Sequence, residues 1–178
     1  MKKIIILGAN PVASALAETL ANEKNDITVV DTNSEKLQEL KDRIDIGTII
    51  GQASHPDVLE KAGGEDADMI IAVTDSDEIN MVACQVAYTL FHTPTKIARI
   101  RAVEYLIYND LFVQEALPVD VLISPEHLIS QYIQRLIEHP GALQVLDFAD
   151  GKIKLLAMRA DKDGPLIGKR LQDISELT

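Results

Sequence analysis

KKIIILGANPVA, at residues 2–13, and ITVVD, at residues 27–31, decide the fold of this chain. The apolar, β-branched run before Gly8 predicts a buried strand, and ITVV predicts a second strand. Between them, apolar residues recur with the spacing of one helix face. Strand, turn, helix and strand in this order open a dinucleotide-binding fold, in which an acidic residue about 20 positions after the first glycine holds the ribose. Asp31 stands near that position, so we expect it to bind a ribose 2′-hydroxyl, the alternative being a cap on the next helix.

The glycine loop departs from the usual pattern. Such loops read G-x-G-x-x-G/A, whereas residues 8–13 read GANPVA. Gly8 fits the tight turn and Ala13 fits the third position. Asn10 replaces the glycine that lets the backbone approach a pyrophosphate, and Pro11 has no N–H to offer a phosphate. Because proline suits the first position of a helix, the loop predicts a strand, turn and helix but leaves pyrophosphate binding open.

Strands and helices alternate as far as residue 124. Further strands are predicted at 47–51, 68–74, 95–100 and 118–123, with helices between them. Ser34 is the expected N-cap of the helix that follows Asp31. Alternating elements joined by short loops predict an α/β fold, a doubly wound, six-stranded parallel sheet of the Rossmann type. We therefore expect residues 1–124 to form a nucleotide-binding domain.

The pattern changes after residue 124. Residues 125–140 predict a crossover helix with one broad apolar stripe, made of Leu128, Ile129, Tyr132, Ile133, Leu136 and Ile137. The stripe could pack on the chain's own sheet, but that sheet already has its six strands and helices. We therefore expect the helix to pack on a second copy and form a homodimer. Residues 141–178 predict a hairpin and, near 166–171, one further element, the start of a small, truncated α+β subdomain.

Composition limits the partners and the compartment. With a net charge of −11 over 178 residues, the chain lacks the basic clusters that binding to nucleic acid or an anionic membrane needs. The single cysteine, Cys84, is expected in the core, which excludes an internal disulfide and suits a reducing compartment. No apolar run approaches the roughly 20 residues of a membrane span, and the amino-terminal run is too short for a signal peptide. We expect a cytoplasmic protein without direct membrane insertion.

Polar residues follow the predicted strands at the edge where the ligand crevice of such a sheet lies. Gln52 and Ala53 follow the third strand, Thr74 and Asp75 follow the fourth, and Arg99 ends the fifth. Thr74 and Asp75 are expected to line the sugar or base region, unless the Thr74 hydroxyl only bonds its own loop. Arg99 is expected to pair with a phosphate or with a nearby carboxylate, since buried arginines need partners. The four histidines show no catalytic or metal-binding spacing.

Five motifs resemble a known family. They are IIILGANPVA at 4–13, VVDTN at 29–33, GQASHPDVL at 51–59, DMIIAVTDSDEINMVACQVA at 68–87 and IARIR at 97–101. Together they resemble the amino-terminal part of the regulatory proteins of Trk-type potassium uptake, which belong to the RCK (or KTN) domain family. The resemblance covers essentially the whole chain. It implies a regulatory subunit, not an enzyme, held at the inner face of the cell membrane by a membrane potassium transporter, assembled as a homodimer or larger homo-oligomer, and binding NAD, NADH, ATP or ADP.

The same resemblance implies a set of binding residues. Those that would contact the nucleotide are Gly8, Ala9, Asn10, Pro11, Val12, Asp31, Thr74, Asp75 and Arg99, with Gln52 and Ala53 close by. Residues 141–178 would begin the RCK carboxyl-terminal subdomain. The chain departs from the family at Asn10-Pro11, where a glycine and a non-proline residue are usual. Two alternatives remain, a ligand-free scaffold of the same fold and a fragment of an NAD-dependent oxidoreductase, although the chain is too short to hold a substrate domain with a proton donor.

Overall fold

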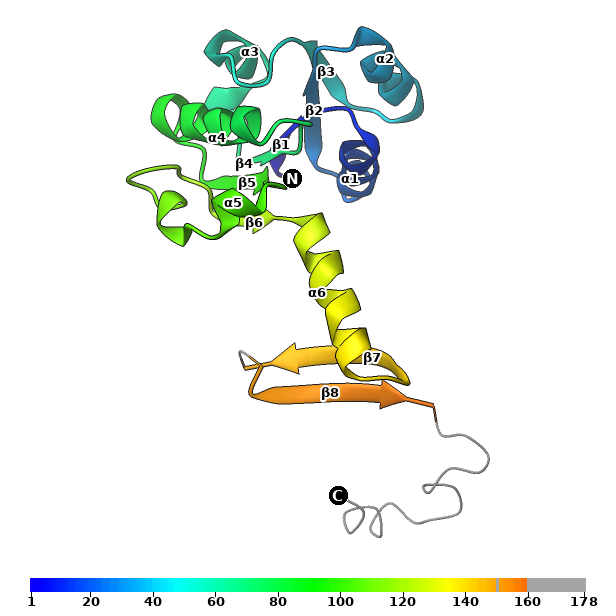
Figure 1. Cartoon of the computed structure of the whole chain (residues 1–178). Helices are drawn as coiled ribbons and strands as arrows, with labels where there is room; N and C mark the ends of the chain where they lie inside the picture. The colour runs from blue at the N-terminus through cyan, green and yellow to red at the C-terminus, as the bar shows by residue number, and fades with distance from the viewer. Residues whose placement is uncertain (150, 160–178) are drawn as a thin grey trace, which may run out of the picture. The chain divides into compact units, whose positions relative to one another are not determined.

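The computed structural model describes residues 1–149 and 151–159, which fall into two units, residues 1–125 and the described residues from Glu126 onward (Figure 1). The first unit is built on a parallel sheet whose strands are β1 (Lys3–Leu7), β2 (Asp26–Asp31), β3 (Gly47–Ile50), β4 (Met69–Ala72), β5 (Thr95–Arg99) and β6 (Val121–Ile123). Their order is β3-β2-β1-β4-β5-β6. The predicted doubly wound α/β fold is therefore confirmed, with the strand order reversing between β1 and β4.

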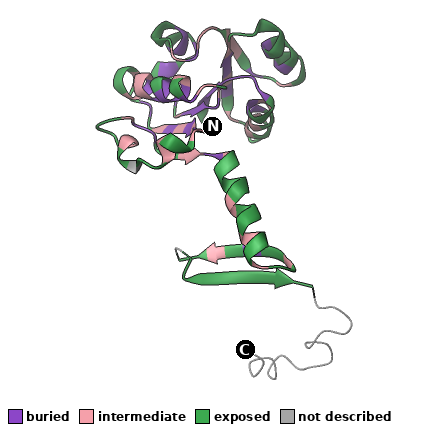
Figure 2. Ribbon diagram, viewed as in Figure 1, coloured by how far each residue is buried: buried purple, intermediate pink, exposed green. Residues whose placement is uncertain are grey.

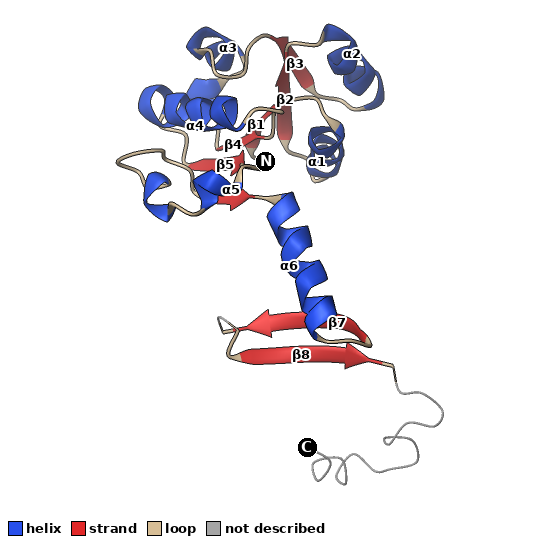
Figure 3. Ribbon diagram, in the orientation of Figure 1, coloured by secondary structure: helices blue, strands red, loops and turns tan. Residues whose placement is uncertain are grey.

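Helices cover both faces of this sheet (Figures 1 and 3). They are α1 (Pro11–Asn22), α2 (Ser34–Arg43), α3 (Pro56–Lys61), α4 (Asp77–Phe91) and α5 (Val103–Leu106), with 3-10 turns at η1 (Gly64–Asp66) and η2 (Asn109–Leu111). Side chains alternate across β1, so that Ile4 and Ile6 face the core under α1 and α2, while Ile5 and Leu7 face the core under α3 and α4. Figure 2 shows this buried layer in purple.

Small residues let the helices lie close to the strands. Ala13 and Ala17 of α1 are fully buried, as are Ala83, Cys84 and Ala87 of α4. The predicted core position of Cys84 is confirmed. Burial in these apolar surroundings raises the pKa of its thiol to about 12. Cys84 is thus a packing residue, and the neutral thiol is the form that the core accepts.

Two local predictions need correction. Ser34 does not cap α2 but is its first residue; Asn33 is the N-cap, and its Oδ1 accepts from the backbone N–H groups of Glu35 at 2.9 Å and Lys36 at 3.1 Å. Asparagine is as good an N-cap as serine, and the two are adjacent, so the sequence pattern could not separate them. β6 begins at Val121 rather than at 118, because the Val119 N–H bonds to the Leu117 carbonyl at 2.8 Å in a tight turn before the strand.

The second unit contains α6 (Pro125–Glu138), apart from its first residue, and an antiparallel hairpin of β7 (Ala142–Phe148) and β8 (Ile153–Met158) (Figure 3). Arg135 Nε lies 2.9 Å from Asp147 Oδ2 and ties the helix to the hairpin. Much of the apolar stripe of α6 is exposed, 60% for Leu128 and 73% for Ile137. The element predicted near 166–171 lies outside the described residues. Within the described ranges, no helix is both long and apolar enough to cross a bilayer.

Candidate functional site

A cavity of about 460 Å³ lies where the strand order reverses between β1 and β4. This carboxyl edge is the usual ligand crevice of doubly wound folds. Many of the residues expected at a ligand site line the cavity, namely Gly8, Ala9, Asn10, Asp31, Gln52, Ala53, Thr74 and Asp75. The other three predicted residues lie outside its lining. Pro11 lines a neighbouring hollow beside α2, Val12 is an exposed residue of α1, and Arg99 ends β5.

Gly8 brings the loop after β1 against the loop after β4. Its φ of +104° is a conformation that L side chains rarely adopt. A Cβ at this position would lie 3.2 Å from the Val73 carbonyl oxygen and from the Thr74 backbone. Glycine is therefore required here both by the turn and by the closeness of the two loops, which together form the floor of the cavity.

Asp31 joins the loop after β1 to the loop after β2. Its Oδ2 accepts from the Ala9 N–H at 2.6 Å, and its Oδ1 accepts from the Asn33 N–H at 2.8 Å. Neither oxygen caps α2, because Asn33 does so. Each carboxylate oxygen has a second lone pair, so the side chain keeps the capacity to accept a hydroxyl hydrogen from a ligand in the cavity.

Asn10 caps α1 from inside the cavity wall. Its Oδ1 accepts from the backbone N–H groups of Val12 at 3.1 Å and Ala13 at 3.0 Å, and its Nδ2 donates to the Val73 carbonyl at 2.5 Å. The residue is only 9% exposed. Its backbone is extended, with φ −81° and ψ 172°, as the following proline favours. The asparagine that breaks the glycine motif is thus a fully engaged helix cap.

Thr74 is held by a buried residue that the sequence analysis did not identify. Asn80, in α4, is completely buried. Its Oδ1 accepts from the Thr74 hydroxyl at 2.7 Å and from the Thr74 N–H at 2.9 Å, and its Nδ2 donates to the Arg99 carbonyl at 2.9 Å. The Thr74 hydroxyl therefore bonds within the protein, and Asn80 links the end of β4 to the end of β5. The sequence signal that could have identified Asn80 is the presence of a polar residue within the apolar stripe of α4.

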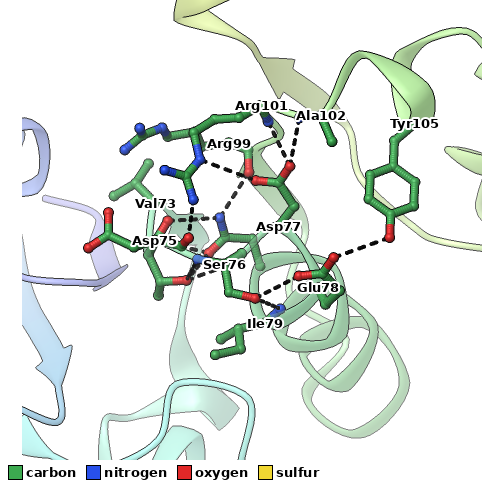
Figure 4. Close-up of polar contacts among 12 residues, drawn as sticks. Val73, Asp75, Ser76, Asp77, Glu78, Ile79, Arg99, Arg101, Ala102 and Tyr105 are labelled. Carbon is green, nitrogen blue, oxygen red and sulfur yellow. Dashed lines mark hydrogen bonds and ion pairs between the residues drawn. The ribbon is translucent and has the colours of Figure 1, made fainter.

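A second polar group surrounds the start of α4 (Figure 4). Asp77 is 6% exposed, and its Oδ2 accepts from the backbone N–H groups of Arg101 at 2.9 Å and Ala102 at 2.8 Å. The Arg101 guanidinium donates to the Asp75 carbonyl. These bonds fix the loop after β4 to the loop after β5. Only the Asp75 backbone carbonyl takes part in them, and Asp75 is also among the residues that line the cavity.

Glu78 completes this second group. Its own backbone N–H, then hydrogen bonds from the Ser76 hydroxyl at 2.8 Å and the Tyr105 hydroxyl at 3.2 Å, hold the pKa of the Glu78 carboxyl below its ordinary value. The same bond to Glu78 raises the pKa of Tyr105. Since this hydrogen bond is exposed to solvent, it orients the side chains and contributes little to stability.

The charges on the cavity wall are mixed, and one of them was not predicted. Asp31 and Asp75 supply carboxylates, and among the described residues Lys36 is the only Lys or Arg in the lining. Lys36 is the third residue of α2, and no sequence motif places this residue beside the cavity. Thr32, Asn33 and Ser76 also line the cavity and were not predicted. The described ranges contain no group of three His, Cys, Asp or Glu side chains suited to a metal.

Comparison with known families gives one match over most of the first unit. The family model for the TrkA-N domain matches residues 4–125. "Trk system potassium uptake protein TrkA" of Halomonas elongata is 61% identical over 169 residues, which cover 95% of this chain and 37% of that protein. The protein of the same name from Vibrio alginolyticus is 55% identical over 175 residues, covering 98% and 38%. The chain thus spans little more than a third of the length of these relatives.

Solved structures show the same fold. The TrkA-N domain of the inner membrane protein ybaL from Escherichia coli has a TM-score of 0.66 and 18% identity, covering 76% of this chain and 96% of that one. The GsuK channel bound to NAD has a TM-score of 0.67 and 20% identity, covering 84% and 26%. GsuK bound to ADP has a TM-score of 0.58 and 22% identity, covering 69% and 31%. At these identities the likeness is one of fold.

Proposed function

This chain belongs to the TrkA-N domain family, and we propose that it is the nucleotide-sensing part of a cytoplasmic regulatory subunit of a potassium uptake transporter. The observation that carries this proposal is the cavity at the strand reversal, with the Asp31 carboxylate beside the Gly8 turn. Its support comes also from relatives that are named as potassium uptake proteins. In this role the chain binds a ligand and transmits its presence, and it performs no chemistry on it.

The proposed ligand is an adenine nucleotide, NAD or NADH or, in their place, ATP or ADP. Asp31 would accept hydrogen bonds from the ribose hydroxyls, since it stands at the carboxyl end of the second strand beside the glycine turn. Thr74 and Asp75 would border the sugar or base, with Gln52 and Ala53 on the opposite wall. Solved structures of this fold have been determined with NAD and with ADP, which supports this ligand class.

The proposed partner is the membrane subunit of a potassium transporter, which would hold the protein at the inner face of the cell membrane. We also propose a homodimer, or a larger homo-oligomer, built through the apolar stripe of α6. Leu128 and Ile137 are exposed in the single chain, and such apolar side chains support the proposal that a second copy covers them. Binding of the purified chain to a detergent-solubilised Trk-type membrane subunit, compared with and without nucleotide, tests the partner.

Calorimetric titration tests the ligand. We expect the wild-type chain to bind at least one of NAD, NADH, ATP and ADP, and Asp31→Ala to weaken that binding by about tenfold or more, as a lost charge-assisted hydrogen bond requires. Asp42→Ala is the matched control, because Asp42 is an exposed carboxylate of α2 outside the cavity lining. Absence of binding by all four nucleotides would favour the second candidate, a ligand-free scaffold. That candidate is supported by the Asn10 side chain, which already accepts hydrogen bonds from the backbone N–H groups at the start of α1.

A further inference from the structure

The turn after β1 has already used its backbone donors. In Rossmann-type sites, N–H groups of this turn and of the following helix hold the pyrophosphate. Here the Gly8 N–H donates to the Val30 carbonyl at 2.7 Å, and the Ala9 N–H donates to Asp31 Oδ2 at 2.6 Å. Both donors therefore point into bonds within the protein, and neither is available to a phosphate without breaking the turn.

The first turn of α1 has no donors to spare either. Pro11 has no N–H. The N–H groups of Val12 and Ala13 donate to Asn10 Oδ1, and that of Ser14 donates to the Asn10 carbonyl at 2.9 Å. From residue 8 to residue 14, all within the described range, only the N–H of Asn10 itself has no acceptor in the protein. A loop that usually supplies several donors to phosphate supplies at most one here.

The Asn10 side chain is fixed in this position. Its Nδ2 bond to the Val73 carbonyl, at 2.5 Å, ties it to the loop after β4. Turning the amide away from α1 would break that bond and both bonds to the helix. It would also leave a buried carbonyl without a donor, which is costly. The Asn10 side chain is therefore a fixed part of the folded structure, and a ligand would not displace it easily.

The charge of the residues that line the cavity also disfavours the binding of phosphate groups. Asp31 and Asp75 line the cavity together with Lys36, so the lining includes one more acidic than basic residue. The whole chain has a net charge of −11. Each phosphate that enters would add negative charge to an environment that offers few compensating groups.

We infer that Asn10 closes the phosphate-binding end of the site, so that the cavity recognises the adenosine part of its ligand and gains little affinity from phosphate groups. This inference rests on the proposed function and narrows its ligand class. Asp31 would hold the ribose, and the apolar wall formed by Val30, Ala53 and Ile79 would pack on the base. NAD, ADP and AMP then bind largely as carriers of adenosine.

Calorimetric titration with a series of ligands tests the inference. Adenosine, AMP, ADP and NAD should bind the wild-type chain with dissociation constants within about threefold of one another. In the double variant Asn10→Gly/Pro11→Gln, the helix N–H groups are released and one is added. ADP and NAD should then bind about tenfold more tightly, because charge-assisted bonds to phosphate form, while adenosine should bind as before.

Asn10→Ser is the matched control, because serine keeps an N-cap oxygen on α1. Its dissociation constants for adenosine, AMP, ADP and NAD should stay similar to one another, as in the wild-type chain. Thermal melts would show that both variants fold. A tenfold or larger gain from adenosine to ADP in the wild-type chain would overturn the inference while leaving nucleotide binding intact. An unchanged ADP affinity in the double variant would remove Asn10 from its assigned role. Failure of all four ligands, adenosine included, would overturn both the inference and the proposed function.

Discussion

Asp31 is the residue that we expect to discriminate between a ribose with a free 2′-hydroxyl and one with a 2′-phosphate. A 2′-phosphate would bring negative charge beside its carboxylate, and Thr32, Asn33 and Ser34 offer no positive charge to offset it. We predict that NAD binds about tenfold or more tightly than NADP, and that Asp31→Ala reduces this preference. Competition between the two dinucleotides in a binding assay measures the ratio. Equal affinities in the wild-type chain would show that Asp31 does not contact the 2′-position.

Lys36 provides the control for that prediction. It lines the same cavity as Asp31 and, within the part of the chain that the structure describes, is the one basic residue of that lining, so it could partly accommodate a 2′-phosphate. Lys36→Met should therefore widen the gap between NAD and NADP. A narrower gap would mean that Lys36 contacts the ligand elsewhere.

The buried thiol of Cys84 gives a prediction that does not depend on a ligand. With its pKa raised to about 12 from an ordinary value of 9.0, the thiol stays protonated in the folded chain at pH 8. Since the thiolate is the reactive form, Cys84 should not react with a thiol reagent until the chain unfolds. Between pH 9 and pH 12 the unfolded chain loses this proton and the folded chain keeps it, so stability should fall as pH rises. Rapid labelling of native protein at pH 8 would contradict this.

Single residues also show how far the sequence could be interpreted. Asp31 and Gly8 could be predicted because a strand, a turn and a spacing define their places. The place of Asn10 in the turn after β1 could be predicted from the glycine motif, but its bonds to Val73 and to α1 could not, because they depend on how closely two loops approach. Lys36 was missed because no motif marks the first turn of α2 as part of the cavity lining.

At the scale of elements, β4 and β5 are joined at their carboxyl ends through α4. Asn80 makes this connection with bonds to Thr74 and to the Arg99 carbonyl. Asn80→Ala would leave these buried groups without partners, and we predict a loss of about 3 kcal/mol in the free energy of unfolding, since each unsatisfied group costs about 1–3 kcal/mol. Gln85→Ala, in the same helix and at a partly exposed position, should cost less than about 0.5 kcal/mol. Urea denaturation followed by circular dichroism measures both, and equal losses would contradict the assigned role.

The elements differ in how well their pattern predicts them. β1 and β4 are buried on both faces, and continuous apolar runs mark such strands. β6 has only three residues, Val121–Ile123, and its start follows a tight backbone turn between Leu117 and Val119 that residue preferences do not mark. α4 could be predicted from its apolar face, but the role of Asn80 required knowledge of which strand ends that face covers. The match of the TrkA-N family model over residues 4–125 agrees with the resemblance that the motifs predicted.

At the scale of the whole molecule, the prediction concerns assembly. The stripe of α6 carries six large apolar side chains, each contributing about 1.5–3 kcal/mol when buried. We predict a homodimer in solution at micromolar concentration, measured by light scattering. Ile133→Asp should shift it toward monomer, because it would place a charge in the centre of the buried stripe. Gln134→Asp, on the opposite side of the same helix, should leave the dimer intact. A stable wild-type monomer would contradict the prediction, as would a dimer unaffected by Ile133→Asp.

The central position of β1 in the sheet also affects how the protein folds during synthesis. β1 leaves the ribosome first and can pair with β2 early, through partners such as Ile4 and Ile27. The other edge of β1 stays unpaired until β4 has been synthesised, since Lys3 and its partner Asp68 are separated by 65 residues. Until β4 emerges, a nascent chain presents the apolar strand of Lys3–Leu7 with one edge unpaired, the kind of edge that other chains can join. Translation that pauses before Met69 should therefore lower the yield of folded protein, and chaperones that hold apolar segments should restore it.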